Sequence, residues 1–356
     1  MRERKIRVCS QQDDADTVKK GGRPIKVTPT KTMQFQGRIS MIDASAKHEQ
    51  FILEDNGNKH YVLDKDFEIR TQFQTPYERY TLSAIHPKEP YIATMGKDNI
   101  LHIVDLNGVD IWTKPGEYIA ACWTLDGAEL YTLLRLDSHT LKLIVYNNAG
   151  EAIAEKEFKD ELYESFALLS TIPNHTEMTM HLMAGQDGCL TVFVSLSGDN
   201  IISLRFLHDY YSYTCASFNE SGSQFLCIEN DERSIYHFTY PELKEIGKRE
   251  FDALDFTLIY LDNKAIIRCN ENFYLLDVNT MEIAEDFIIA GHEPVPTCEI
   301  YKRLKDDSLM CDISYLCSTG KHILGHANRE GLCDIVVLDK EAHYGKRANT
   351  TNKHFA

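Results

Sequence analysis

Two histidines have the spacing closest to that of a metal site in this chain of 356 residues: His322 and His326 in the segment KHILGH. An extended strand places residues four apart on one face but about 13 Å from each other, which is too far for one ion unless the chain bends. The sequence also lacks the HExxH motif and the DxDxDG calcium loop. We therefore expect no bound metal, and we interpret the two histidines as polar residues near strand ends.

Signatures of nucleophilic or phosphate chemistry are also missing from the sequence. There is no GxSxG motif, and the glycine and serines of NESGS (residues 219–223) suit a tight turn. The segment GKDN (residues 96–99) is predicted to be a hairpin turn rather than a phosphate-binding loop. Paired carboxylates are numerous in an acidic chain, so their spacing identifies no acid and base. We expect no catalytic residue, no cofactor and no enzyme activity.

The ten cysteines include no CxxC pair, so neither zinc-ribbon nor thioredoxin-like spacing occurs. Six of them lie in or beside strand-like apolar runs, where cysteine packs as a small hydrophobic residue: Cys122, Cys189, Cys215, Cys227, Cys269 and Cys333. This predicts reduced thiols in a reducing compartment. No run approaches the ~18 apolar residues of a membrane span, and the start lacks the apolar segment of a secretory signal. We expect a cytoplasmic protein with no membrane partner.

Charge is distributed unevenly along the chain. The total formal charge is −16, but residues 1–38 carry +6 and residues 340–356 carry +3, which leaves −25 on residues 39–339. An acidic body argues against nucleic acid as the main ligand, and its field favours the approach of a basic protein or peptide. Solubility alone is the alternative explanation of this charge.

The elements that must position any site are short strands. The stretch from Tyr80 to Gly116 contains the apolar runs TLSAI, YIATM, ILHIV and VDIW, each closed by Pro, Gly, Asp or Asn. Four strands of about five residues form a small antiparallel sheet that cannot bury both of its faces alone. Such a sheet needs neighbours of the same kind, and the chain is longer than the ~250 to 300 residues of one ordinary core.

A turn between the second and third strands marks the repeat. It recurs as DNGN, GKDN, RLDS, GQDG, NDER and NEN, at Asn56, Asp98, Asp137, Asp187, Asp231 and Glu271. The spacings of 42, 39, 50, 44 and 40 residues are close to the ~40 to 45 of a propeller blade. A further instance at Glu330 follows an extra stretch from Glu293 to Met310, which we interpret as an insertion of unassigned role.

The third strands of the repeat end alike. Four of the seven close with two apolar residues and an aspartate, at Asp64, Asp105, Asp277 and Asp339. This resembles the Trp-Asp position of WD-repeat propellers, although the tryptophan is absent. The Gly-His pair of that family is also missing from the expected loops, because it occurs only at His292 and His326. The resemblance covers roughly residues 36–340 and implies a ring of four-stranded blades that serves as a binding platform.

We predict an all-β fold: a single β-propeller of seven blades of four antiparallel strands, with six or eight blades as alternatives. The predicted blades cover residues 36–74, 75–116, 117–158, 159–207, 208–251, 252–291 and 292–342. Residues 1–35 are predicted to be a flexible basic arm and residues 343–356 a basic tail. The last blade shows only three strands, so we expect the segment IKVTPTKTMQF near the N-terminus to supply its outer strand and close the ring.

A binding face follows from the predicted ring, because the segments that lead into the innermost strands gather on one side. Seven of the chain's 18 tyrosines lie in these segments among carboxylates. The predicted contact residues are Tyr77, Tyr80, Glu117, Tyr118, Glu161, Tyr163, Glu164, Asp209, Tyr210, Tyr211, Tyr213, Asp252 and Asp255. Such rings suit the Lys and Arg side chains of a partner through cation–π contacts. The alternative for each tyrosine is packing between adjacent blades.

Three functions stay open at this point. The leading hypothesis is a non-catalytic platform that binds a basic protein or peptide, as a monomer or as a subunit of a hetero-complex. An inhibitor or immunity-type protein that neutralises a basic toxin is a variant of it. A propeller enzyme, such as a lactone hydrolase with residues around the central channel, is the alternative from a different class.

Overall fold

The structure, a computed structural model, describes most of the ring. The described residues are 25–36, 39–45, 50–55, 57–74, 79–96, 98–159, 166–183, 189–207, 213–229, 233–251, 258–261, 263–269, 272–289, 313–319, 322–329 and 332–339. The insertion predicted at residues 293–310 and the tail predicted at residues 343–356 lie outside them.

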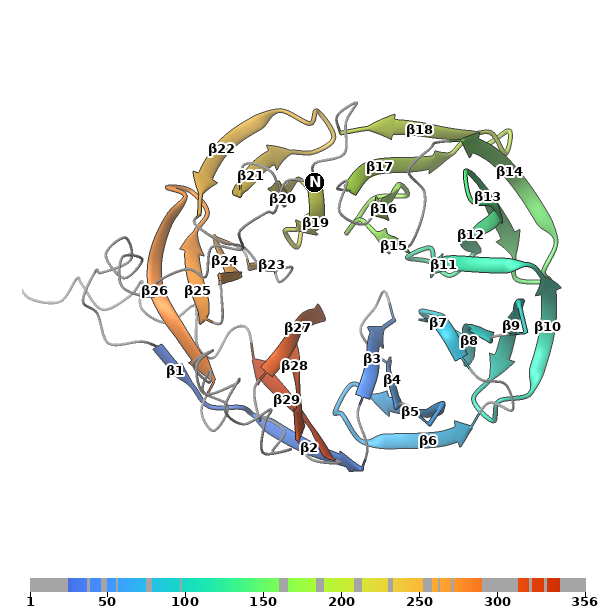
Figure 1. The fold of residues 1–356 in the computed structure, drawn as a ribbon, viewed down its shortest axis with the longest axis horizontal. Helices are drawn as coiled ribbons and strands as arrows, with labels where there is room; N and C mark the ends of the chain where they lie inside the picture. The colour runs from blue at the N-terminus through green and yellow to red at the C-terminus, as the bar shows by residue number, and fades with distance from the viewer. Residues whose placement is uncertain are drawn as a thin grey trace, which may run out of the picture.

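Seven sheets are arranged around a central axis, which confirms the predicted seven-bladed propeller (Figure 1). Blade 1 contains β3 (Ile39–Ala44), β4 (Gln50–Asp55), β5 (Lys59–Asp64) and β6 (Ile69–Gln74). Blade 2 contains β7 (Arg79–Ile85), β8 (Tyr91–Gly96), β9 (Ile100–Asp105) and β10 (Asp110–Pro115). Blade 3 contains β11 (Glu117–Trp123), β12 (Glu129–Asp137), β13 (Thr140–Asn147) and β14 (Ala152–Lys159).

The remaining blades follow in chain order. Blade 4 contains β15 (Phe166–Thr171), β16 (Met178–Met183), β17 (Cys189–Leu196) and β18 (Ile202–Phe206). Blade 5 contains β19 (Tyr213–Phe218), β20 (Gln224–Glu229), β21 (Ser234–Thr239) and β22 (Glu245–Glu250). Blade 6 contains β23 (Leu258–Leu261), β24 (Lys264–Cys269), β25 (Asn272–Asp277) and β26 (Glu282–Ile289). Blade 7 contains β27 (Ile313–Thr319), β28 (His322–Arg329) and β29 (Leu332–Asp339).

The burial of each strand follows its place in the blade. The middle strands β4, β5 and β9 are each buried at four consecutive positions. Each of these strands lies between two neighbouring blades, and one blade covers each of its two faces. The outer strand β10 is exposed or half-buried at all six positions. The continuous apolar runs seen in the sequence are therefore middle strands, and the more polar runs that follow them are outer strands.

Adjacent blades share their apolar cores. The largest cluster joins blades 3 and 4 and includes Ile119, Leu143, Met180 and Val192. Similar clusters join blades 2 and 3 and blades 7 and 1. Each blade is thus stabilised by its neighbours rather than by a core of its own, which is why the fold needs the whole ring.

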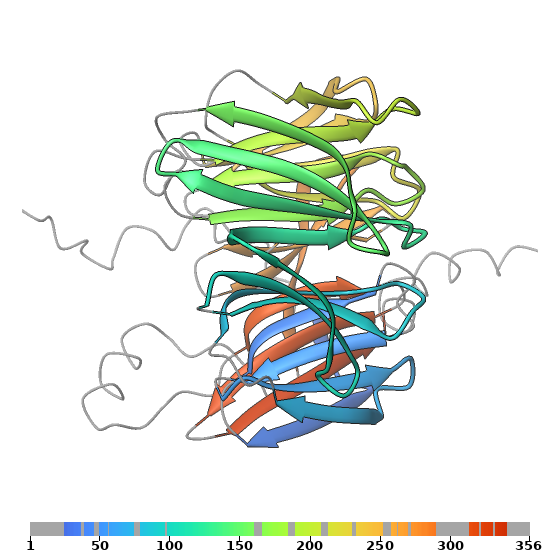
Figure 2. The same ribbon diagram turned by 90° about the vertical axis from the view of Figure 1, so that its right-hand side faces the viewer.

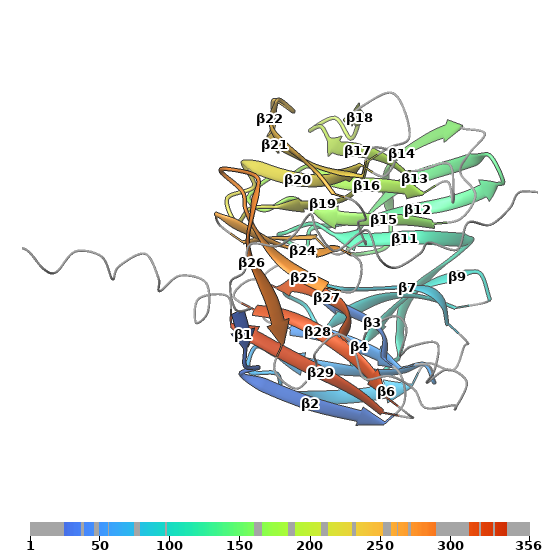
Figure 3. The same cartoon turned by 60° about the vertical axis from the view of Figure 1, so that its left-hand side comes forward.

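The N-terminal segment closes the ring, as predicted, and it does so with two strands. Strand β2 (Lys31–Gln36) pairs antiparallel with β29 and becomes the outer strand of blade 7. Strand β1 (Ile25–Val27) pairs parallel with the end of β26 and adds a fifth strand to blade 6. The two strands follow one another along the outer rim (Figures 1 and 3). Val27 is fully buried in the cluster between blades 6 and 7.

The aspartates at the ends of the third strands stabilise turns. The Asp64 carboxylate accepts hydrogen bonds from the backbone N–H groups of Asp66 and Glu68, and Asp105 does the same for Asn107 and Val109. In blade 3 the side chain of Asn147 takes this place. The feature that resembles the WD repeat therefore caps the turn between the third and fourth strands.

The antiparallel order of the strands gives the disc two faces, seen from the side in Figure 2. We call one the crossover face: there each outer strand ends, the next inner strand begins, and the second and third strands meet in a turn. We call the other the turn face: it contains the turns between the first and second strands and between the third and fourth strands. The described residues contain no helix long and apolar enough to span a membrane.

Candidate interaction surface

The predicted contact residues belong to segments that open or precede inner strands. Tyr80 lies in β7 and Tyr213 opens β19, and the backbone alone of these two residues is described. Nine others lie outside the described residues: Tyr77, Glu161, Tyr163, Glu164, Asp209, Tyr210, Tyr211, Asp252 and Asp255. Each of the nine falls in a stretch that joins the outer strand of one blade to the inner strand of the next. Glu117 and Tyr118 remain, and the structure describes both side chains.

Tyr118 is 1% exposed and packs between blades 2 and 3. Its hydroxyl lies 2.7 Å from the hydroxyl of Tyr146, and burial raises the pKa of the Tyr118 phenol. Gly116, with a φ of +137°, brings the chain from β10 into β11 at this point, and a Cβ there would lie 2.5 Å from the Leu134 side chain. The ring of Tyr118 is therefore not on the crossover face, because it fills the space between two blades.

Glu117 is on the crossover face but already has a partner. Its carboxylate accepts a hydrogen bond of 2.7 Å from Arg135 Nη1, and the two residues are opposite each other in the pairing of β11 with β12. Their side chains are 35% and 21% exposed, respectively. A basic group of a partner has to compete with Arg135 for this carboxylate.

Exposed apolar side chains lie close to these positions, and sequence reasoning missed them. Leu136, at the end of β12, is 46% exposed, and Phe206, the last residue of β18, is 43% exposed. Leu168, on the inner strand β15, is 45% exposed. Leu136 and Phe206 are on the crossover face of adjacent blades 3 and 4. The signal in the sequence is an apolar residue within the otherwise polar turn RLDS or just before the tyrosine-rich segment HDYYSY.

Two histidines of blade 2, His86 and His102, make internal contacts through both ring nitrogens. His102 is bracketed by two carboxylates, with Nδ1 2.9 Å from Asp110 Oδ1 and Nε2 3.1 Å from Asp98 Oδ2. His86 Nδ1 accepts hydrogen bonds from the N–H groups of Lys88 and Glu89, so its Nε2 donates to the carbonyl of Gly127, 2.8 Å away. Both nitrogens of each ring are thus engaged within the protein.

Three further groups, the buried His181 and His237 and the half-buried Cys122, are held in neutral forms. Burial lowers the pKa of His181 and of His237 to about 4, and His237 Nε2 is 3.1 Å from the Tyr260 hydroxyl. Burial also raises the pKa of the Cys122 thiol, with a smaller contribution from the negative charge of Asp43. At neutral pH the two imidazoles are unprotonated and the thiol is not a thiolate, so these groups pack as parts of the core.

The described residues include no cluster of three or more His, Cys, Asp or Glu residues arranged to hold a metal ion. His322 and His326 both belong to β28, opposite Asp339 and Ile335, respectively. The backbone of both positions is therefore extended, with the two histidines four positions apart along the strand.

A scan against protein-family models and a search of curated proteins found no match to this chain.

Proposed function

We propose that this propeller is a non-catalytic platform that binds a basic protein or peptide on its crossover face. The observation that carries the proposal is the composition of the segments that lead into the inner strands. Besides the buried Tyr118, they contain six tyrosines interleaved with carboxylates, on a body with a net charge of −25. The strands that flank these five segments begin or end on one face of the ring, which supports a single shared contact surface.

The exposed apolar residues Leu136 and Phe206 support the same face. Interfaces combine a few well-packed apolar anchors with a polar rim, and tyrosine-rich segments among acids supply such a rim for a basic partner. With Tyr118 buried and Glu117 paired to Arg135, the proposed contact residues on this face are the other eleven. Phe206 precedes the segment with Asp209, Tyr210 and Tyr211 by a few residues, so we place the centre of the site there.

We also propose that the ring is WD-repeat-like and that the protein acts in the cytoplasm. The capping role of Asp64 and Asp105 at corresponding ends of third strands supports the first point. The position of Cys122, Cys189, Cys227 and Cys333 in apolar strand runs supports the second, because cysteine packs there as a small hydrophobic residue, as is usual in reducing compartments.

Capture from lysate on the immobilised chain tests the proposed function. We expect a basic protein that is retained at low salt and released at high salt, as detected by mass spectrometry. The double substitutions Tyr210→Ala/Tyr211→Ala and Leu136→Ser/Phe206→Ser remove it. The matched control is Val109→Ser/Ile201→Ser, because these residues are 62% and 60% exposed on the turn face. Loss of the captured protein in the control as well, or turnover of lactone or ester substrates by the purified chain, contradicts the proposal.

A further inference from the structure

The closing strand β2 is held by its side chains as well as by its backbone. Six residues of β2 pair with β29, from Lys31 opposite Val337 to Gln36 opposite Leu332. Just before the strand, the Thr30 hydroxyl donates a 3.0 Å hydrogen bond to the carbonyl of Val337. Gln34 Nε2 donates to the carboxylate of Asp334 at 3.3 Å. Blade 7 therefore recognises particular residues in its outer strand.

Phe35 is the apolar anchor of this strand. It is 5% exposed and contacts the ring of Tyr61 in blade 1 edge to face, with the centroids 5.0 Å apart. Thr32, Gln34 and Gln36 are exposed, so Phe35 is the only fully buried side chain that β2 contributes. A single aromatic residue thus fixes the strand between two blades.

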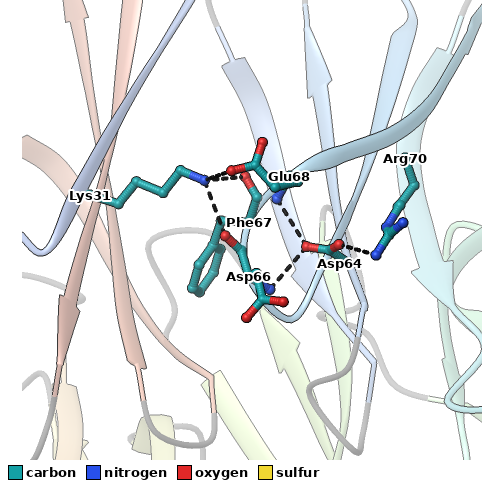
Figure 4. Close-up of polar contacts among 6 residues, drawn as sticks. All are labelled: Lys31, Asp64, Asp66, Phe67, Glu68 and Arg70. Atoms are coloured by element: carbon teal, nitrogen blue, oxygen red, sulfur yellow. Dashed lines mark hydrogen bonds and ion pairs between the residues drawn. The ribbon is translucent and has the colours of Figure 1, made fainter.

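Lys31 is the polar anchor, and blade 1 forms a socket for it (Figure 4). Its ammonium group donates to the carbonyls of Asp66 and Phe67 at 3.1 and 3.0 Å and to Glu68 Oε1 at 2.6 Å. The shape of this turn is set within blade 1, because the Asp64 carboxylate accepts the N–H groups of Asp66 and Glu68 and pairs with Arg70 at 2.6 Å. The socket does not depend on Lys31 for its geometry.

Together these contacts define a peptide site for an extended strand of the form Lys-x-x-x-Phe, occupied by the protein's own residues 31–35. No covalent bond within blade 7 joins β2 to β29, since 295 residues separate Gln36 from Leu332. Addition of a strand to an open sheet edge is a common mode of peptide recognition, and exchange of an identical element between two copies is a low-cost route to a dimer. A second copy carries the same strand and the same site.

We propose that the closing strand is exchangeable, so that the β29 edge and the Lys31 socket of one molecule take residues 30–36 of a second copy and form a strand-swapped dimer. This inference does not depend on the proposed partner of the crossover face, because β2 lies on the outer rim. The exchange forms no new type of contact: the same hydrogen bonds are made between copies instead of within one.

A labelled synthetic peptide of residues 24–37 tests the site. We expect it to bind the full-length K31A/F35A variant, whose own strand is weakened, at least about tenfold more tightly than the wild-type chain, whose site is filled. A peptide with Phe35→Ala loses at least about tenfold in affinity for the same variant, since the anchor is gone. If K31A/F35A does not fold, as judged by circular dichroism, the single variant K31M takes its place.

The acceptor side has its own matched pair of variants. Adding Glu68→Ala to K31A/F35A weakens peptide binding, because it removes the carboxylate of the socket, whereas adding Glu89→Ala, an exposed acid on the turn face, does not. Equal binding of the two peptides, or a larger effect of Glu89→Ala than of Glu68→Ala, overturns the proposal.

Light scattering of the wild-type chain gives an independent measurement. After concentration in mild urea and return to buffer, we expect a species with twice the 40.8 kDa of the monomer, which excess peptide of residues 24–37 converts to monomer. The F35A peptide leaves the dimer intact. A mass that stays at 40.8 kDa throughout, or a dimer that the peptide does not dissociate, overturns the proposal.

Discussion

The boundary between blades 2 and 3 and the boundary between blades 7 and 1 differ in how the chain holds them together. At the first, one residue, Gly116, joins the outer strand β10 to the inner strand β11. At the second, the outer strand β2 is joined directly to the following blade but meets its own blade only through hydrogen bonds and packing. Blade 7 therefore depends on the pairing of β2 with β29, two strands from distant parts of the sequence.

The two boundaries also use different side chains. Between blades 2 and 3, rings pack on turns: Trp112 covers Gly150, and His86 covers Gly127 and donates to its carbonyl. Between blades 7 and 1, Lys31 reaches the carbonyls of the turn at Asp66 and Phe67. Buried rings contribute apolar area at both boundaries, since Phe35 packs on Tyr61 at the second, but only the second adds a half-exposed ammonium with a few hydrogen bonds.

Removal of the closing strand is expected to have the largest effect. Deletion of residues 24–36 uncovers β29 and removes the buried Val27 and Phe35, each worth several kcal/mol, so Tm falls by about 10 °C or more. Differential scanning calorimetry measures this change. Deletion of residues 2–20, which belong to the arm predicted at residues 1–35, is the control. Unchanged melting of the 24–36 deletion contradicts the role of β2 in stability.

The next largest effect is expected at the boundary of blades 2 and 3. Gly127 has a φ of +74°, and a Cβ there would lie 2.3 Å from His86 Cε1. Gly127→Ala therefore combines a disfavoured backbone conformation with a clash against a buried ring, and we expect a loss of about 2 to 4 kcal/mol in urea unfolding. Gly198→Ala is the matched control, because no atom lies within 4 Å of a Cβ at that position. Equal effects of the two substitutions contradict this explanation.

The sequence predicted the ring well and the site only in part, for physical reasons. Middle strands are buried on both faces, so their apolar runs and the turns that follow them are visible in the sequence. The split of the N-terminal segment into β1 and β2 was not predicted, although the shared Gln-Phe-Gln of residues 34–36 and 72–74 marks both β2 and β6 as outer strands.

Tyr118 shows the limit for the site. A tyrosine at the start of an inner strand has the same sequence context whether its ring faces a partner or a neighbouring blade. The buried hydroxyl of Tyr118 is satisfied by a hydrogen bond with the hydroxyl of Tyr146, which lies 28 residues away in the sequence. A pairing of this kind depends on how two blades pack, so the local sequence does not encode it. Leu136 and Phe206 were not predicted as contact residues. An apolar residue in a strand has the same sequence pattern whether its side chain is exposed or buried.

Loss of one buried hydroxyl tests the same boundary at a smaller scale. Tyr118→Phe leaves the Tyr146 hydroxyl without its partner in a buried position, so we expect a loss of about 1 to 3 kcal/mol in urea unfolding. Tyr146→Phe gives a similar loss, and the double variant is less destabilised than the sum because no unpaired hydroxyl remains. Strict additivity of the two substitutions contradicts a shared hydrogen bond.

Acidification is expected to distinguish the two boundaries. Burial lowers the pKa of His86, although the hydrogen bond with the Gly127 carbonyl opposes this. A histidine whose pKa is lower in the folded state binds fewer protons there than in the unfolded chain. Its full contribution to the free energy of unfolding is therefore present above pH ~6.5 and is lost as the pH falls below that value. We expect the stability difference between wild type and His86→Asn to shrink between pH 7.5 and 5.5. A difference that stays constant over this range contradicts the prediction.

The smallest effect is expected at Lys31. Lys31→Met keeps the aliphatic part of the side chain and removes the ammonium group. The Lys31 side chain is 31% exposed, and that of its ion-pair partner Glu68 is 72% exposed. An exposed ion pair contributes little, so most of the expected loss of about 1 kcal/mol comes from the bonds to the Asp66 and Phe67 carbonyls. Glu68→Gln then costs less than half as much as Lys31→Met, and added salt reduces the effect of Glu68→Gln more than that of Lys31→Met. If Glu68→Gln costs as much as Lys31→Met, the closing contact is an ion pair rather than a carbonyl socket. Such a result also makes the boundary between blades 7 and 1 the one that salt weakens, while the rings between blades 2 and 3 remain insensitive to it.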